Sequence, residues 1–254
     1  NYNCNKMKYR IGQIVPSSNV TMETEIPAIF RSRETILPER FTFHSSRMRM
    51  KKVTKEELEA MDAMSLKCAQ ELSDAHVDVM GYACLVAIMS MGRGYNCVSE
   101  VNLHQETVAN DFPTPIVTSA GALINGLKVL GAKQISIITP YMRPLTDMVV
   151  DYIENQGIKV KQSIALEIPD NLEVAAQNPM NLLEIYKQLD LTDVDVLVAS
   201  ACVQMPSLEA IDLIQAECGI PVTSAAVCTT YEMMKKLNIE PKSAIGGELL
   251  SGKY

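Results

Sequence analysis

The sequence predicts an α/β protein of two similar Rossmann-like lobes, each a mostly parallel sheet flanked by helices, with the active site between them. Two observations lead to this fold class. Short β-branched runs alternate with helical patterns along the chain. Three landmarks also recur in the same order in the two halves of the 254 residues. We therefore expect lobes at residues 9–131 and 132–250, related by a pseudo-two-fold axis.

The predicted strands are short runs rich in Val, Ile and Thr, and most are bounded by turn residues. They alternate with longer segments of helical periodicity, as expected when helices cross over between parallel strands. The strands are expected at residues 10–15, 41–48, 77–82, 116–118, 134–139, 159–165, 194–199 and 222–223.

Three helices have boundaries that can be read directly. Thr54 and Glu57 have the spacing of a capping box ahead of an apolar stripe. Gly131 and Gly157 follow two further helical patterns, where glycine can adopt the left-handed conformation that ends a helix. We expect helices over 54–73, 120–130 and 144–155.

The internal repeat rests on three pairs of segments. In each pair a strand runs into the same short motif: a proline, an Ala-Cys pair, or the start of a helix. Three matches in the same order indicate duplication better than chance. The pairs are 10–16 with 134–140, 77–84 with 194–202, and 115–120 with 221–225.

The repeat places two cysteines at equivalent positions. Cys84 and Cys202 each follow a buried strand, as Pro16 and Pro140 do. Ligands of parallel sheets bind beyond the carboxyl ends of the strands. Two similar lobes facing each other across a cleft would bring Cys84 and Cys202 together. Both thiols are therefore candidate functional groups, with a pKa lowered by loop amides and a helix N-terminus.

The other five cysteines have no such counterpart. Cys68 lies on the apolar stripe of its helix, and Cys218 and Cys228 are interpreted as packing residues too. Cys4 belongs to a tail without a pattern, and Cys97 has no assigned role. An odd number of irregularly spaced cysteines without an export signal indicates reduced thiols.

Several functions are disfavoured by what the sequence lacks. It has no Cys/His spacing typical of zinc sites and no glycine-rich nucleotide loop, so neither a metal nor an organic cofactor is expected. The net charge of −7, with no basic stripe, argues against nucleic acid or an anionic membrane as partner. No apolar stretch is long enough to span a membrane, and we expect a cytoplasmic protein that binds a small molecule.

Polar residues follow the other two strand ends. Ser17, Ser18 and Asn19 come after Pro16, and by themselves they are best explained as the cap of the next helix. Tyr141 occupies the equivalent place after the partner strand and cannot cap a helix in that way. A ligand-binding role for Asn19 and Tyr141 therefore stays open beside the capping interpretation.

At these residues the sequence resembles the maleate cis-trans isomerase family of the aspartate/glutamate racemase superfamily. The resemblance is carried by the segments 15–23, 81–84 and 200–206 and extends from about residue 9 to residue 247. It implies a homodimer acting on a small dicarboxylate. It also implies a nucleophile, Cys84, a second catalytic cysteine, Cys202, and carboxylate ligands Asn19, Tyr141 and Asn171. Arylmalonate decarboxylases of this superfamily keep only the second cysteine, so the presence of both argues against decarboxylation.

For such an isomerase, thiolate addition removes the double bond, rotation follows, and elimination releases the trans product. Cys202 would donate and later remove a proton at the neighbouring carbon. Backbone amides around Leu85, Val86 and Val203 are expected to stabilise the charge that develops on a substrate carboxylate.

Two other functions remain open from the sequence. A racemase could use both cysteines as acid and base, but it needs a group for the substrate ammonium, for which only Glu23 or Asp170 is available. A non-catalytic binding protein for a dicarboxylate would not need paired thiols. Titration of the thiols distinguishes an enzyme from such a binding protein.

Overall fold

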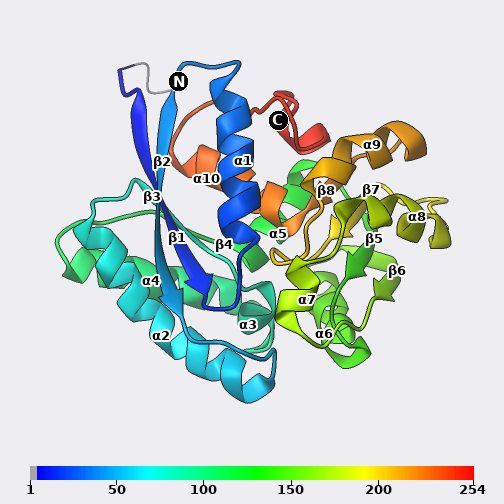
Figure 1. Cartoon of the computed structure of the whole chain (residues 1–254), viewed down its shortest axis with the longest axis horizontal. Coiled ribbons are helices and arrows are strands. Elements are labelled where there is room, and N and C mark those ends of the chain that lie inside the picture. Colours follow the sequence, from blue (N-terminus) through cyan, green and yellow to red (C-terminus); the bar gives the residue numbers. More distant parts are fainter. Residues whose placement is uncertain (1–4) are drawn as a thin grey trace.

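The computed structural model describes residues 5–254, so Cys4 lies outside the described residues. Within this range, two four-stranded sheets have the orders β2-β1-β3-β4 and β6-β5-β7-β8, and all named strand pairs are parallel. The identical strand orders confirm the predicted two-lobed α/β fold (Figure 1). The strands are β1 Lys8–Pro16, β2 Arg40–Met48, β3 Val79–Tyr82, β4 Ile116–Thr118, β5 Gln134–Thr139, β6 Lys159–Ala165, β7 Val196–Ser200 and β8 Val222–Ser224, each within two residues of its predicted bounds.

Helices connect the strands and cover the sheets. Among residues 5–254, none is both long and apolar enough to cross a membrane. The helices are α1 Met22–Glu34, α2 Lys55–Asp74, α3 Leu85–Met89, α4 Tyr95–Ala109, α5 Ser119–Val129, α6 Arg143–Glu154, α7 Asn171–Ala175, α8 Leu182–Ile185, α9 Leu208–Cys218 and α10 Ala225–Lys236, with 3₁₀ turns at Pro179–Asn181, Tyr186–Gln188 and Glu248–Leu250.

The predicted helix signals have the expected local geometry. Thr54 Oγ1 accepts a hydrogen bond from the Glu57 amide at 3.3 Å at the start of α2. The Glu57 carboxylate reaches further back than in a standard capping box and accepts from the amides of Lys51 and Lys52. It thereby fixes the segment that precedes α2. Gly131 follows α5 with a φ of +71°, the left-handed conformation predicted for it.

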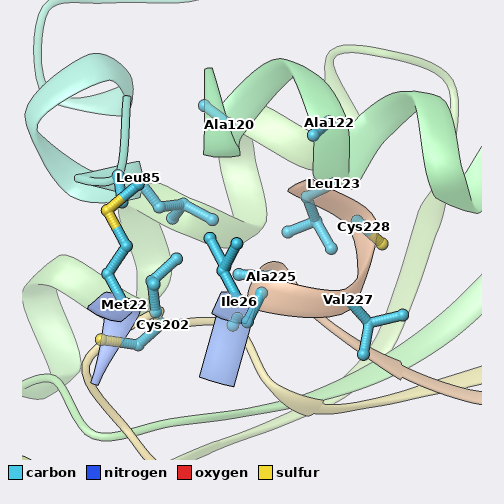
Figure 2. Close-up of a cluster of buried hydrophobic side chains, with 14 of the residues drawn as sticks. Met22, Ile26, Leu85, Ala120, Ala122, Leu123, Cys202, Ala225, Val227 and Cys228 are labelled. Atoms are coloured by element: carbon cyan, nitrogen blue, oxygen red, sulfur yellow. The ribbon is translucent and has the colours of Figure 1, made fainter. Parts of the chain in front are cut away.

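The strands that lead to the two cysteines are buried along their whole length. Every residue of β3 and of β7 is buried, which explains their continuous apolar sequence. Side chains from both halves form one core: Met22, Leu85 and Leu123 of the first half and Cys202 and Ala225 of the second belong to the cluster drawn in Figure 2. The ends of β3 and β7 are therefore held by close packing on all sides.

The end of the chain returns to the first half. Helix α10 packs against α5, α1 and β3 (Figure 1). Gly126 permits the close approach of α5 to α10, because a Cβ there would lie 2.7 Å from Cys228 Sγ. Cys228 is fully buried in this contact, as predicted for a packing residue, and Cys68 is buried on α2. All six described cysteines are free, Cys97 being exposed and Cys218 partly buried. The placement of the boundary between the two lobes at residues 131 and 132 stays a proposal.

A buried carboxylate joins the two halves beside the predicted site. Glu25 on α1 accepts hydrogen bonds from the amides of Ser207 and Leu208, at 2.9 and 2.8 Å, where α9 begins. Its other oxygen, Oε1, is buried with no hydrogen-bond partner among the described residues. Burial is the main cause that raises the pKa of Glu25 to about 7, against the lowering effect of the two amides.

This burial predicts a pH-dependent stability. Because the folded protein holds the Glu25 proton up to about pH 7 and the unfolded chain releases it near its ordinary pKa, stability falls as pH rises between these values. Glu25→Gln should reduce this pH-dependent fall in the free energy of unfolding by up to about 3 kcal/mol. Urea unfolding at pH 5 and pH 8 measures it, with the exposed Glu59→Gln as control. An identical pH dependence in Glu25→Gln and wild type would contradict the prediction.

Candidate functional site

The carboxyl ends of β1, β3, β5 and β7 meet around one small pocket, as predicted from the strand ends. Its cavity is about 20 Å³, enough for roughly one water molecule. No charged side chain is among the described residues that line it. The lining consists of Pro16, Asn19, Met50, Val53, Ala83, Cys84, Leu85, Val86, Tyr141, Asn171, Cys202, Val203 and Gln204.

All eight residues predicted for the site therefore lie around this pocket. The first half contributes Asn19, Cys84, Leu85 and Val86, and the second half contributes the other four. Their roles in binding and catalysis stay predictions.

Cys84 lies between the end of β3 and the start of α3. It occupies the N-cap position of the helix, and the residue is 8% exposed and lines the pocket. The backbone amides of Ala87 and Val86 donate to the sulfur and lower its pKa, but burial outweighs them and raises the pKa of the Cys84 thiol to about 12. Repulsion from the Cys202 sulfur when that thiol is ionised, and from Asp62, raises it further.

Cys202 occupies the equivalent place after β7, in the loop 201–207. Three donors reach its sulfur: the Tyr141 hydroxyl and the amides of Gln204 and Met205. Burial still raises the pKa of the Cys202 thiol. The Ser200 hydroxyl holds the loop by donating to the carbonyls of Cys202 and Met205, at 2.8 and 3.1 Å.

The expectation of lowered thiol pKa values is wrong for this structure. Amides do face both sulfurs as expected, but the thiolates would be almost fully shielded from water. Loss of hydration disfavours the charged form more than a few amides favour it. Helix α3 has only five residues and contributes few aligned peptide dipoles.

Tyr141 extends from the end of β5 into the pocket. Its hydroxyl donates to the Ala201 carbonyl at 3.3 Å and lies within hydrogen-bonding reach of Cys202. The side chain is buried, and burial together with the neighbouring Cys202 raises the pKa of the phenol. Tyr141 is therefore a neutral donor at neutral pH.

The two asparagines combine a structural contact with a place in the pocket. Asn19 Oδ1 accepts from the Met22 amide at 2.9 Å, so the capping interpretation is correct for this residue. Asn171 Nδ2 donates to Ser18 Oγ at 2.8 Å, which joins the start of α7 to the turn after β1. Both side chains are buried and both line the pocket.

Sequence reasoning missed one polar and two apolar residues that line the pocket around the thiols. Gln204 lies within the segment that carried the family resemblance, and a lone amide in an apolar loop was a signal that could have found it. Met50 and Val53 come from the connection between β2 and α2, and no sequence pattern distinguishes them.

A buried acid lies behind Cys84. Asp62 on α2 accepts from the hydroxyls of Tyr82 and Tyr95, at 2.8 and 2.7 Å. Tyr82 belongs to β3, two residues before Cys84, so the acid is fixed near the thiol. The negative charge of Asp62 distinguishes the surroundings of Cys84 from those of Cys202, which has the Tyr141 hydroxyl as a neighbour.

Comparison with known proteins identifies the family. The family model for arylmalonate decarboxylase matches residues 11–250. A maleate isomerase of Pseudomonas putida is 61% identical over 246 residues, which are 97% of this chain and 98% of that one. The chain belongs to the maleate isomerase family.

Solved structures of maleate isomerases have the same fold. The maleate isomerase Iso of Pseudomonas putida S16, a cysteine-to-alanine variant crystallised with maleate, is 61% identical with a TM-score of 0.96 over 97% of this chain and 99% of that one. A cysteine-to-serine variant of the Nocardia farcinica maleate cis-trans isomerase carries a covalently bound succinylcysteine intermediate. It is 40% identical, with a TM-score of 0.93 over 97% of this chain and 100% of that one.

Membership of the maleate isomerase family confirms the resemblance inferred from the motifs and makes this chain an isomerase. The alternative of a non-catalytic binding protein is thereby set aside. The pocket at the two cysteines is the candidate active site of this isomerase.

Proposed function

We propose that this chain converts maleate to fumarate without a cofactor, by covalent addition of Cys84 to the double bond. The observation that carries the proposal is the pocket itself, in which equivalent cysteines of the two halves meet among uncharged residues. The relatives that bind maleate or carry a succinylcysteine support it. A racemase would need a partner for an ammonium group, and no carboxylate is among the described lining residues.

Once the Cys84 thiol has lost its proton to solvent, the reaction balances with the two thiols alone. The Cys84 thiolate adds to one alkene carbon of maleate, and the neighbouring carbon takes the proton of the Cys202 thiol. The product is a succinyl group bound to Cys84, with Cys202 as thiolate. After rotation about the new single bond, Cys202 removes the proton again, the C–S bond breaks, and fumarate leaves with Cys84 restored as thiolate.

The raised pKa of Cys202 suits its part in this cycle, because a thiolate of high pKa is a stronger base. The raised pKa of Cys84 makes its thiolate scarce before addition, although that thiolate is intrinsically more nucleophilic than one of low pKa. Removing a proton from a carbon next to a carboxylate needs a strong base, which a Cys202 of raised pKa supplies. The proton donated in the first half of the cycle is the one regained in the second.

We infer that the substrate carboxylates bind the neutral donors Asn19, Tyr141 and Asn171. Neutral donors suit a dianion whose carboxylates must move apart during rotation, since rigid bidentate arginine pairs would oppose that movement. Leu85, Val86 and Val203 border the thiols, and their backbone amides would stabilise charge on a carboxylate during addition.

The space between the lining residues is narrow for a four-carbon diacid, and we infer that substrate binding widens it. Met50 and Val53 are the lining residues that belong to the β2–α2 connection rather than to a strand end. Ser17 holds this connection, since its hydroxyl donates to the Met50 carbonyl and accepts from the Met50 amide. We infer that release of these contacts admits the substrate.

Removing one neutral donor should weaken substrate use without unfolding the protein. Tyr141→Phe and Asn19→Ala each delete a hydrogen bond to a carboxylate worth about 1.5 to 3 kcal/mol, which is roughly a 10- to 150-fold loss in kcat/KM. Asn19→Ala also deletes the cap of α1. Steady-state kinetics with maleate and thermal unfolding separate the two effects.

Asn19→Asp is the matched variant, because it keeps an oxygen for the Met22 amide while placing a negative charge in the pocket. It should lose more kcat/KM than Asn19→Ala and less stability. Unchanged kinetics in Tyr141→Phe and in both Asn19 variants would show that these residues have only structural roles, in helix capping and packing, and do not bind the substrate.

A direct assay tests the proposed function. Purified, desalted protein incubated with maleate and a chelator should produce fumarate, which proton NMR distinguishes from maleate. Absence of fumarate, or a need for added metal, would overturn the proposal.

We also infer a homodimer. Val98, Val101 and Val108 lie on α4 and are 50, 55 and 48% exposed, which is consistent with a face that packs against a second copy. Light scattering should give twice the mass of the chain. A monomer at working concentration would contradict the inference.

A further inference from the structure

The Gln204 side chain uses its whole hydrogen-bonding capacity inside the protein. It is 2% exposed. Its Oε1 accepts from the amides of Val20 and Thr21, at 3.0 and 3.3 Å. Its Nε2 donates to the carbonyls of Ser18 and Asn171, at 2.8 and 2.9 Å. A buried carboxamide with two donated and two accepted bonds has little freedom to move.

These four bonds join three segments that meet at the pocket. Ser18 and Val20 flank Asn19 in the turn after β1, and Asn171 opens α7 in the other half. Gln204 itself belongs to the Cys202 loop. One side chain thus ties together the backbones that carry two of the three predicted carboxylate ligands, Asn19 and Asn171.

The main chain of Gln204 adds a contact on each side. Its carbonyl accepts from Thr21 Oγ1 at 2.7 Å. Its amide N–H donates to the sulfur of Cys202. The side chain and the carbonyl therefore fix the peptide that presents this N–H to the thiol.

We propose that Gln204 is a positioning residue that sets the spacing of Asn19 and Asn171 across the two halves and aims its own backbone amide at Cys202. The part that concerns the carboxylates rests on the proposed function. The part that concerns the Cys202 thiol does not. Nothing in the contacts of Gln204 involves Cys84, so the two thiols should respond differently to its replacement.

Two substitutions of similar size distinguish the hydrogen bonds that the Gln204 side chain accepts from those that it donates. Gln204→Glu keeps an oxygen for the amides of Val20 and Thr21 but sets oxygen against the carbonyls of Ser18 and Asn171. Gln204→Met removes all four bonds while retaining apolar volume. Gln188→Glu, at an exposed position of the 3₁₀ turn Tyr186–Gln188, is the control for the same change of charge.

The first measurement is independent of the substrate. Iodoacetamide alkylation of Cys202 and Cys84 is followed by peptide mass spectrometry from about pH 7 to about pH 10, where thiolate formation controls the rate. Both Gln204 variants should slow alkylation of Cys202 at a given pH at least about threefold and shift its profile to higher pH, because the Cys202 thiolate loses an oriented donor. The Cys84 profile should move less than that of Cys202, because only its electrostatic coupling to Cys202 is affected.

The second measurement is kinetic. Both variants should lower kcat/KM for maleate at least about 10-fold, mainly through a higher KM. Their melting temperatures should lie below that of Gln188→Glu, because buried groups lose their partners, but above the assay temperature. Equal shifts of both thiol profiles would overturn the proposal in favour of a general structural role. Unchanged profiles and unchanged KM would overturn it as well. If the wild type fails to isomerise maleate, the proposed function fails, while the alkylation profiles still decide the role of Gln204.

Discussion

Cys84→Ala should lose both isomerisation and covalent attachment of maleate. The substitution removes the sulfur that forms the bond to the alkene, and no other group near α3 can replace it. Because rotation about an intact double bond is prohibitively slow, loss of the nucleophile should leave no measurable turnover rather than a reduced rate. Intact-mass spectrometry after incubation with maleate should find no adduct, and proton NMR should find no fumarate.

Cys228→Ala is the matched control for this loss. Cys228 is also a fully buried cysteine, and burial raises the pKa of its thiol to about 12 as well. Its sulfur packs between α10 and α5 and is not among the residues that line the pocket. Cys228→Ala should cost some stability and keep turnover. An adduct on Cys202 in Cys84→Ala would exchange the roles of the two cysteines.

The fold could be predicted because it depends on local and repeated features. Buried parallel strands need continuous β-branched runs, and helices need readable ends, so both leave marks in the sequence. The repeat then related the strand end at Cys84 to the one at Cys202, and the identical order of the two sheets has the same origin. The return of α10 to the first half was not predicted, since a helix pattern does not indicate which sheet it covers.

The site was predictable where its residues follow strand ends. Asn19, Cys84, Tyr141 and Cys202 belong to that group, and all four line the pocket. Met50 depends instead on the path of a long connection through space. Such a path is decided by tertiary packing, which spacing along the chain does not record.

The pKa of the thiols could not be derived from neighbouring residue types alone. The sequence indicated that loop amides would face Cys84 and Cys202, but the balance between hydrogen bonding and lost hydration depends on how tightly the pocket closes. The structure also shows a difference that the repeat conceals. Asp62 adds a negative charge that raises the pKa of Cys84, whereas the Tyr141 hydroxyl lies within hydrogen-bonding reach of Cys202 and lowers its pKa.

This difference supports separate roles for the two cysteines. Cys84 is followed by Leu85, Val86 and Ala87, an apolar start of α3 that shields an attacking sulfur from water. Cys202 receives bonds from Tyr141 and from two amides, which can stabilise the thiolate left after it donates its proton. A group that must give up and regain a proton in each cycle benefits from such donors.

Cys202→Ser should therefore stop turnover while leaving Cys84 able to attack. A serine hydroxyl is a far weaker acid than a thiol and does not form the base that must remove the proton again, so the cycle should stall after addition. Mass spectrometry after incubation with maleate should find one added maleic acid, and peptide mapping should place it on Cys84. Cys202→Ala should give the same adduct more slowly, because it lacks a hydroxyl to relay a proton to the carbon. The succinylcysteine in a cysteine-to-serine variant of the Nocardia farcinica enzyme is the precedent for this species.

The double variant of Cys84→Ala with Cys202→Ser is the control and should carry no adduct. Substantial fumarate production by Cys202→Ser would show that proton return does not need this thiol, and the paired-cysteine mechanism would then be wrong.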